Sequence, residues 1–202
     1  MTSLAALESS FGEQTSMLIG NRIPKDFFVT SGVGQSDITI HAGSYHLALL
    51  DARIEHCNIM TYSSILPKIA RKLDNFDPKK ILHGSVLETI TAVKSVEGVG
   101  NRATAAIMWG WLIDRKTDER CGGLVCEYSE TGSEEEAKQS LAASLDELYT
   151  HGYQDRFHLT KTEFHSRSII AQKRYATALV TLGFINYLLP ILETAEAPKR
   201  KR

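Results

Sequence analysis

The chain has 202 residues and a formal net charge of -1, from 23 Lys and Arg against 24 Asp and Glu. Hydrophobic residues make up 43% of it and only 5 residues are proline, which excludes a disordered or low-complexity chain. No stretch approaches the roughly 18 consecutive apolar residues that cross a bilayer, so we expect no membrane partner. The near-neutral charge argues against nucleic acid as the main partner.

The two ends differ in composition from the rest of the chain. We expect residues 1–22 to form a loosely organised N-terminal arm without the basic flank and apolar core of a signal peptide. Residues 193–202 end in Lys-Arg-Lys-Arg and predict a flexible basic tail, either simply solvated or in contact with an anionic partner. Between them, residues 23–192 predict a single domain. Three cysteines form no disulfide framework and fit the reducing cytoplasm: Cys57, Cys121 and Cys126.

The first half of the chain predicts a strand, a loop and a helix in that order. The aromatic and β-branched residues of Asp26–Thr30 indicate a strand, and the turn-forming residues of Ser31–Ser36 indicate a loop after it. Ser44–Arg53 has helical spacing of apolar residues, with Ser44 as the expected N-cap. Glu55–Ser63 is extended in character, and Pro67 ends that segment because proline cannot donate to a strand ladder.

The second half predicts strands around one long helix. Three strands are expected at Val86–Val96, Ala103–Ile113 and Gly123–Tyr128, and two more at Phe157–Ile170 and Arg174–Phe184. Ser133–Tyr149 predicts a helix that begins with a capping box between Ser133 and Glu136. Strands that follow one another without intervening helices favour an α+β fold, a layered αββα sandwich of mainly antiparallel sheets flanked by helices.

Two common site motifs fail on spacing. Gly32-Val33-Gly34 lacks the third glycine of a dinucleotide fingerprint, because Asp37 stands in its place, and no P-loop lysine follows. A tight turn is the simpler reading. The histidines and cysteines do not have the helical spacing of a zinc site, so we expect no metal.

Six segments occur in one order along the chain, and together they carry more information than any one alone. They are VTSGVG (29–34), YHLALLDARIEHCNI (45–59), SSILP (63–67), HGSVLE (83–88), GGLVCEY (122–128) and TALVTLGFINY (177–187). This set resembles the pyruvoyl-dependent arginine decarboxylase family over residues 24 to 187. SSILP and GGLVCEY are its most specific parts.

The resemblance implies that the chain cuts its own backbone between Ser63 and Ser64. The Ser64 hydroxyl would attack the Ser63 carbonyl, and elimination and hydrolysis of the resulting ester would leave a pyruvoyl group on residue 64. The products would be a β chain, residues 1–63, and an α chain, residues 64–202. Backbone strain and a hydrogen-bond donor to the Ser63 carbonyl would assist this attack, and the family's processing asparagine matches Asn58.

The resemblance also implies the reaction. The covalent pyruvoyl group would form a Schiff base with the amine of L-arginine, and loss of CO₂ followed by protonation would give agmatine. The family's general acid matches Glu127. Its strand neighbours Val125, Cys126 and Tyr128 would desolvate the carboxyl and hold it protonated nearer neutral pH.

Substrate identity is the point at which the sequence departs from the family pattern. The family's aspartate that binds the guanidinium group matches His46, which cannot replace a carboxylate opposite that cation. Asp37, in the loop before the helix, is the first candidate to take over this role, and Asp51 is the second. Alternatively His46 binds part of a different substrate. Lysine, ornithine or histidine decarboxylation therefore stays open beside arginine.

The family builds trimers with active sites between protomers, so the resemblance implies a trimer or a dimer of trimers. A third hypothesis, from another functional class, is an uncleaved homologue that only binds a ligand or partner. The joint presence of Ser64, Asn58 and Glu127 argues against it.

Overall fold

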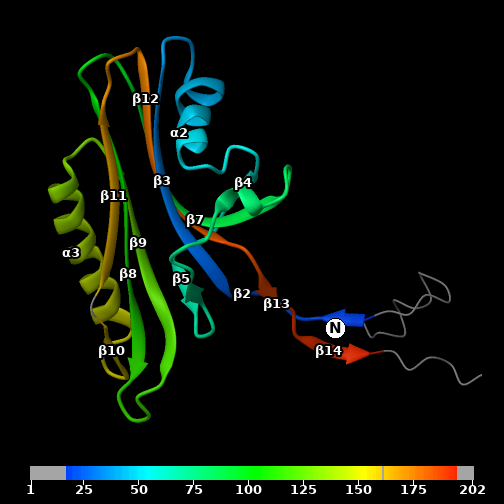
Figure 1. The fold of residues 1–202 in the computed structure, drawn as a ribbon. Helices are drawn as coiled ribbons and strands as arrows, with labels where there is room; N and C mark the ends of the chain where they lie inside the picture. Colours follow the sequence, from blue (N-terminus) through cyan, green and yellow to red (C-terminus); the bar gives the residue numbers. More distant parts are fainter. Residues whose placement is uncertain (1–16, 161, 195–202) are drawn as a thin grey trace, which may run out of the picture. The chain divides into compact units, whose positions relative to one another are not determined.

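The computed structural model describes residues 17–160 and 162–194, so most of the N-terminal arm and of the basic tail lie outside the described residues. The chain divides into a larger unit, residues 24–186, and a smaller unit, residues 1–23 with 187–202. In the larger unit, two β-sheets lie face to face, with helix α2 on the outside of one and helix α3 on the outside of the other (Figure 1). The αββα prediction is confirmed.

One sheet, which we call the β12 sheet, has the strand order β4-β7-β12-β3-β6. Its strands are β3 (Asp26–Ser36), β4 (Asn58–Thr61), β6 (Arg71–Lys72), β7 (Val86–Glu97) and β12 (Tyr175–Phe184). The middle strand, β12, pairs antiparallel with β3 on one side and β7 on the other, while β4 and β6 are parallel edge strands. A π-helical turn, η1 (Ile40–Tyr45), leads into α2 (His46–Asp51), which packs on β3.

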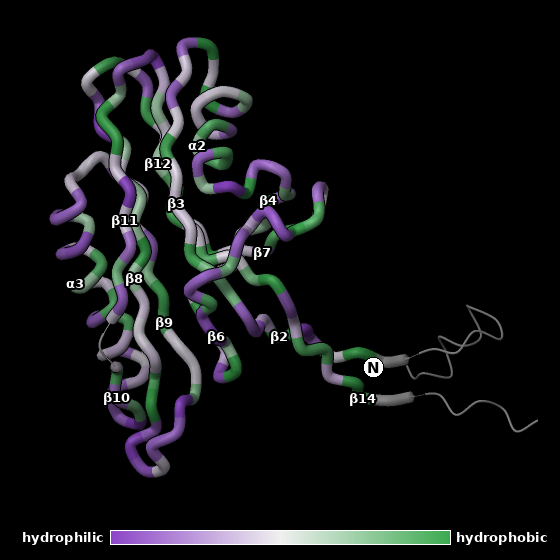
Figure 2. The backbone as a smooth tube through the Cα atoms, viewed as in Figure 1, coloured by the Kyte–Doolittle hydropathy of each residue, from purple (hydrophilic) through white to green (hydrophobic). Residues whose placement is uncertain are grey.

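The other sheet, the β8 sheet, is built on β8 and β9. Its strands are β5 (Ile65–Pro67), β8 (Arg102–Asp114), β9 (Arg120–Glu130), β10 (Phe157–Leu159) and β11 (Glu163–Ile170). β8 pairs with β9 on one edge and with β10 and β11 on the other, and the short β5 pairs with β9. The loop between β8 and β9 is hydrophilic, as the polar sequence there predicts (Figure 2).

Helix α3 (Glu134–Gly152) covers the outer face of the β8 sheet. Its predicted capping box is present. The Glu136 backbone N–H donates to the Ser133 hydroxyl, and the Ser133 N–H donates to the Glu136 carboxylate. Leu141 and Leu145 are buried against this sheet. A short 3₁₀ turn, η2 (Pro78–Lys80), lies in the connection before β7.

The smaller unit is a pairing of the two chain ends. β1 (Met17–Ile19) pairs antiparallel with β14 (Ile191–Thr194), and β2 (Ile23–Pro24) pairs with β13 (Tyr187–Leu188). Among the described residues, no helix is long and apolar enough to cross a membrane.

The prediction of a loop at Ser31–Ser36 is wrong, because β3 continues through both glycines to Ser36. The glycines are there so that the helical segment can pack closely on the strand. A Cβ on Gly32 would lie 2.1 Å from the Ala48 carbonyl oxygen, and one on Gly34 would lie 2.2 Å from that of Ser44. Gly32 and Gly34, which suggested a turn, instead leave room on β3 for η1 and α2.

The helix and strand limits also differ from prediction at three places. Ser44 is not an N-cap: it is buried inside η1 and its hydroxyl is 2.9 Å from that of Thr177. The strand expected at Glu55–Ser63 is shorter, from Asn58 to Thr61. The strand expected at Phe157–Ile170 is divided into β10 and β11, which pair in succession along β8.

A chain of aromatic rings fills the layer between the two sheets. It runs from Tyr62 through Phe184, Phe27 and Trp109 to His165, and successive ring centroids are 5.9, 6.1, 6.3 and 5.2 Å apart. Its first member lies two residues before Ser64. The ring contacts therefore extend from the packed layer to the segment that carries the candidate site.

Candidate active site

The Ser63–Ser64 peptide lies where the chain crosses from one sheet to the other. Before it, the Tyr62 N–H donates to the Thr89 carbonyl of the β12 sheet, with an N···O distance of 2.6 Å. After it, the Ser64 carbonyl accepts the Val125 N–H of the β8 sheet at 3.0 Å. The β12 sheet therefore fixes the chain just before the Ser63–Ser64 peptide, and the β8 sheet fixes it just after.

The Ser64 hydroxyl contacts the Glu127 carboxylate. It lies 2.9 Å from Glu127 Oε2 and 3.1 Å from Oε1 and donates to them. Strand alternation explains why this carboxylate points inward: Cys126 and Tyr128 pack toward α3, so Val125 and Glu127 face the layer between the sheets. The two residues predicted to carry the chemistry thus meet across β5 and β9.

Burial raises the pKa of the Glu127 carboxyl above its ordinary value, and the hydrogen bond from Ser64 partly lowers it again. The side chain is half-buried, as the apolar neighbours in the sequence predict. A carboxyl with a raised pKa takes up a proton more readily than an exposed one. It can therefore accept a proton from Ser64 and donate one to a carbanion.

The Ser63 carbonyl oxygen accepts the Ile65 N–H at 3.0 Å. This bond joins residues i and i+2, so Ser64 is the centre of a γ-turn. In the described part of the chain, the only non-glycine residues with positive φ are Arg53 and Asp118, so the turn at Ser64 is the unstrained inverse form. The backbone strain expected here does not take the form of a positive φ at Ser63 or Ser64. The expected donor to the Ser63 carbonyl is the Ile65 N–H, which the sequence could not identify because a backbone N–H leaves no mark in a motif.

Asn58 is exposed at the start of β4. Its side-chain amide donates to the Gly84 carbonyl at 2.9 Å, so it fastens β4 to the loop before β7. In the folded chain the donor that contacts the Ser63 carbonyl is the Ile65 N–H, and the Asn58 amide contacts Gly84.

The two predicted substrate-binding residues, Asp37 and His46, lie apart from Ser64 in the folded chain. Asp37 accepts the Arg174 backbone N–H at 3.1 Å and is exposed beyond the end of β3. That end pairs with Tyr175 of β12, whereas Thr89, which anchors the cleavage segment, pairs with Gly183. Eight strand residues separate these two levels, about 26 Å at the usual rise of about 3.3 Å per residue.

His46 is the first residue of α2 and is exposed. The second-choice carboxylate, Asp51, is already engaged: it accepts the Val33 N–H at 2.9 Å and lies 3.4 Å from the Arg167 guanidinium. In the folded chain, therefore, neither His46 nor Asp51 contacts Ser64, whose hydroxyl is hydrogen-bonded to Glu127.

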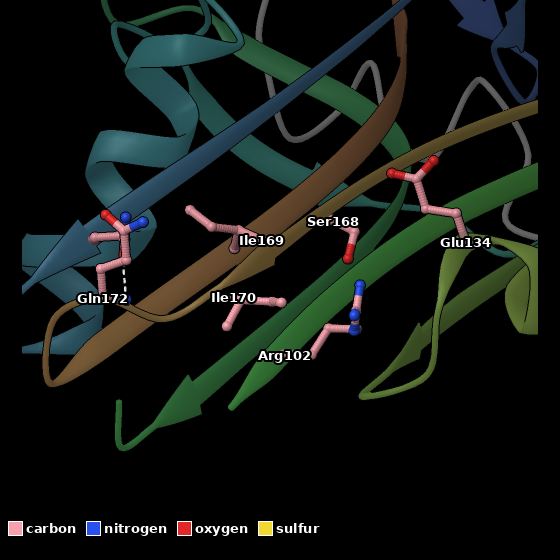
Figure 3. A pocket seen from close by; sticks show the side chains of 7 residues that line it. Arg102, Glu134, Ser168, Ile169, Ile170 and Gln172 are labelled. Carbon is pink, nitrogen blue, oxygen red and sulfur yellow. Dashed lines mark hydrogen bonds between the residues drawn. The ribbon is translucent and has the colours of Figure 1, made fainter. Parts of the chain in front are cut away.

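A pocket lies at the other end of the sandwich, between β11 and the start of α3 (Figure 3). It is lined by Gln35, Arg102, Glu134, Ser168, Ile169, Ile170 and Gln172. Arg102 pairs with Ile170 at the start of β8, several residues from the Ile107 that pairs with Glu127. The pocket does not include Ser64 or Glu127.

Comparison with known proteins agrees with this geometry. The family model for pyruvoyl-dependent arginine decarboxylase (PvlArgDC) matches residues 26–188. Among similar proteins, pyruvoyl-dependent arginine decarboxylase AaxB of Chlamydia abortus is 35% identical over 192 residues, covering 85% of this chain and 95% of that protein. AaxB of Chlamydia pneumoniae is 33% identical and covers 91% of this chain and 99% of that protein.

A more distant relative, the pyruvoyl-dependent arginine decarboxylase of Thermoplasma volcanium, is 31% identical over 124 residues, or 61% of this chain and 65% of that protein. The range matched by the family model includes both residues of the Ser64–Glu127 contact. The paired serines lie at the crossing between the two sheets, and the Glu127 carboxylate contacts the second serine, Ser64. Together with the family-model match, this shows that the chain belongs to the pyruvoyl-dependent arginine decarboxylase family, whose members are carboxy-lyases with a covalent pyruvoyl group.

Proposed function

We propose that this chain cuts itself between Ser63 and Ser64 and then decarboxylates L-arginine to agmatine and CO₂. The observation that carries the proposal is the contact of the Ser64 hydroxyl with both oxygens of Glu127, at 2.9 and 3.1 Å. A hydroxyl held by a carboxylate of raised pKa is a nucleophile beside its base. The family and the names of the relatives support the reaction.

The residues around position 64 fit a pyruvoyl group. Residue 64 is the serine that this group requires, its side chain reaches the layer between the sheets, and its carbonyl is fixed by the Val125 N–H. When present, the group supplies a ketone that binds the substrate amine and accepts the electrons released with CO₂. The chain itself would hold the group at the start of β5, two residues before the fully buried Leu66.

Glu127 would act twice. During self-cleavage its carboxylate accepts the hydroxyl proton of Ser64. During turnover the same carboxyl, kept protonated longer by burial, donates a proton to the substrate carbon that has lost CO₂. One carboxyl could serve both steps because residue 64 stays attached to β5 through Ile65 before and after the cut.

Substrate binding would use a neighbouring protomer, since Asp37 and His46 are exposed and remote from Ser64 in their own protomer. A trimer or dimer of trimers is supported by exposed apolar side chains around the cleavage segment. Met60 on edge strand β4 is 49% exposed and Ile65 on edge strand β5 is 53% exposed. Three free cysteines are consistent with a cytoplasmic enzyme.

Two measurements on the purified protein test the proposal. Mass spectrometry under denaturing conditions is expected to show two fragments, residues 1–63 and 64–202, the larger with a pyruvoyl end. A single species near 22.4 kDa would reject self-cleavage and favour a non-catalytic homologue. Incubation with arginine, lysine, ornithine and histidine in parallel is expected to yield agmatine from arginine. Another amine without agmatine would reject the substrate and favour a role for His46 in binding a different side chain.

A further inference from the structure

We propose that the backbone N–H of Ile65 is the group that stabilises the negative charge formed on the Ser63 oxygen during self-cleavage. The inference rests on the proposed self-cleavage and deepens it by naming the oxyanion donor. Its basis is the 3.0 Å contact from Ile65 N to the Ser63 carbonyl oxygen, the atom on which charge develops. No side chain takes part in this contact.

The geometry makes this donor available at no cost to the sheet. In the β5–β9 pairing, the Ser64 carbonyl is the group that meets Val125. Adjacent residues of a strand present their hydrogen-bonding groups to opposite edges, so the Ile65 N–H points away from β9 and toward the Ser63 carbonyl. β5 is an edge strand, so no further strand of the described chain competes for this N–H.

The step balances within the chain. The proton of the Ser64 hydroxyl passes to Glu127 as Oγ bonds to the Ser63 carbonyl carbon. The carbonyl π electrons move onto the Ser63 oxygen, to which the Ile65 N–H donates its hydrogen bond. The bond between the Ser63 carbon and the Ser64 nitrogen then breaks, and Glu127 returns the proton to that nitrogen. An ester and an amine result, with Glu127 and Ile65 unchanged. Glu127 thus activates the Ser64 hydroxyl, while the Ile65 N–H polarises the Ser63 carbonyl that this hydroxyl attacks.

The fixed position of the peptide explains why a single N–H would suffice. Thr89 holds Tyr62 and Val125 holds Ser64, so the Ser63 carbonyl has little freedom to turn away from its donor. A donor that is already in place when charge develops needs no reorganisation, which is the condition under which such contacts accelerate acyl transfer most.

The test removes the Ile65 N–H and leaves every other hydrogen-bond donor of the chain in place. In Ile65→Pro the nitrogen has no hydrogen, and cleavage of freshly made protein, followed by mass spectrometry, is expected to slow by about 10²–10³-fold. Because proline could also disturb folding, a second variant replaces Ile65 with its α-hydroxy acid analogue, which keeps the side chain and changes N–H to O. It is expected to slow cleavage at Ser63–Ser64 to a similar degree, and mass distinguishes that cut from hydrolysis of the new ester at 64–65.

A matched proline control is Val99→Pro. Val99 is 71% exposed and follows Gly98 in a turn in which the Asn101 N–H donates to the Gly98 carbonyl and Gly100 has φ of +89°. Val99 is the second position of a type II turn, which proline favours. In the Val99→Pro variant, cleavage at Ser63–Ser64 should therefore proceed at the rate of the unmodified chain. Unchanged cleavage in both Ile65 variants would overturn the oxyanion role while leaving self-cleavage intact. An unmodified chain that never cleaves would overturn both.

Discussion

At the scale of single residues, the site is defined by which side of a strand a side chain occupies. Glu127 faces the layer between the sheets because Cys126 and Tyr128 face α3. A shift of one residue in β9 would send the carboxylate to the helix side and end its contact with the Ser64 hydroxyl. The register of β9 against β8 and β5 is therefore as necessary for the chemistry as the identity of Glu127.

Replacing Glu127 with Gln removes the proton acceptor while keeping size and one hydrogen-bonding oxygen. Cleavage of the chain is expected to slow by about 10²–10⁴-fold, and decarboxylation by the cleaved fraction should fall in the same range. In the unmodified chain, cleavage should also fall as the pH drops through the raised pKa of Glu127, because only the carboxylate can accept the proton. Time courses of cleavage between pH 4 and pH 8 measure both effects.

The control for this variant is Glu130→Gln, three residues further along β9, where the carboxylate is exposed and 3.4 Å from the Lys94 ammonium. It should cleave at the rate of the unmodified chain. A pH profile of Glu127→Gln that kept the acidic limb of the unmodified chain would show that another group supplies the base.

His165 gives the fold a dependence on pH. Its ring stacks on Trp109, with centroids 5.2 Å apart and an angle of 9° between planes. Burial lowers its pKa, and the Lys72 ammonium lowers it further, while Glu163 opposes this. Because the unfolded chain then takes up a proton first, this residue's contribution to stability is present above a pH of about 6.5 and is lost as the pH falls.

We therefore expect His165→Phe, which keeps a stacked ring that cannot be protonated, to lose less Tm between pH 7.5 and pH 5.5 than the unmodified chain. Thermal unfolding followed by circular dichroism at several pH values measures the difference. Tm curves that run parallel for the two chains would show that protonation of His165 does not affect stability.

At the scale of elements, the sequence predicts what is local and misses what depends on contacts between segments. The capping box at Ser133 follows from residues three apart, and it is confirmed. The loop expected at Ser31–Ser36 is wrong because the reason for Gly32 and Gly34 lies in η1 and α2, ten or more residues away. The break at Thr160, between β10 and β11, likewise follows from pairing along β8.

The packing role of Gly34 can be measured. Gly34→Ala places a Cβ 2.2 Å from the Ser44 carbonyl oxygen and 2.5 Å from the Ala48 nitrogen, and is expected to lower the free energy of unfolding by about 1–3 kcal/mol. Gly152→Ala is the control: a Cβ there meets no atom within 4 Å, and alanine in a helix is favoured by about 0.5–1 kcal/mol. Denaturant unfolding should therefore move the two variants in opposite directions. A Gly34 variant as stable as the unmodified chain would mean that α2 can shift on β3 without loss.

The same distinction applies to the site. Ser64 and Glu127 could be chosen from the sequence because their side chains carry the chemistry. The Ile65 N–H could not, since every residue except proline has one and only the turn at Ser64 aims it. The family resemblance matches Asn58 to a processing asparagine, but that match does not say that its amide contacts Gly84 in the folded chain.

At the scale of the whole molecule, self-cleavage would divide the chain without dividing the larger unit. Residues 1–63 contribute β3 and β4 to the β12 sheet, and residues 64–202 contribute the other three strands. β3 alone pairs with β12 at ten positions, from Phe27–Phe184 to Ser36–Tyr175. Phe27 and Phe28 are buried within the packed layers on either side of this strand.

We therefore expect the two fragments to remain together after the cut. Size-exclusion chromatography under native conditions should give one peak that contains both, whereas a denaturing gel of that peak should separate them. Release of residues 1–63 from the native peak would show that the β3–β12 ladder does not hold the fragments. The Ser64→Ala variant, which cannot cleave, supplies the reference elution volume.

The position of β3 between β12 and β6 affects how the protein would fold before and after the proposed cut. An intact chain finds this arrangement by intramolecular collapse, at a rate independent of how dilute the solution is. Once severed and then denatured, the same strands belong to two separate molecules, and recovery becomes a bimolecular encounter that dilution slows. If the chain cuts itself as proposed, folding must therefore precede the cut, because two separate fragments would refold more slowly than the intact chain.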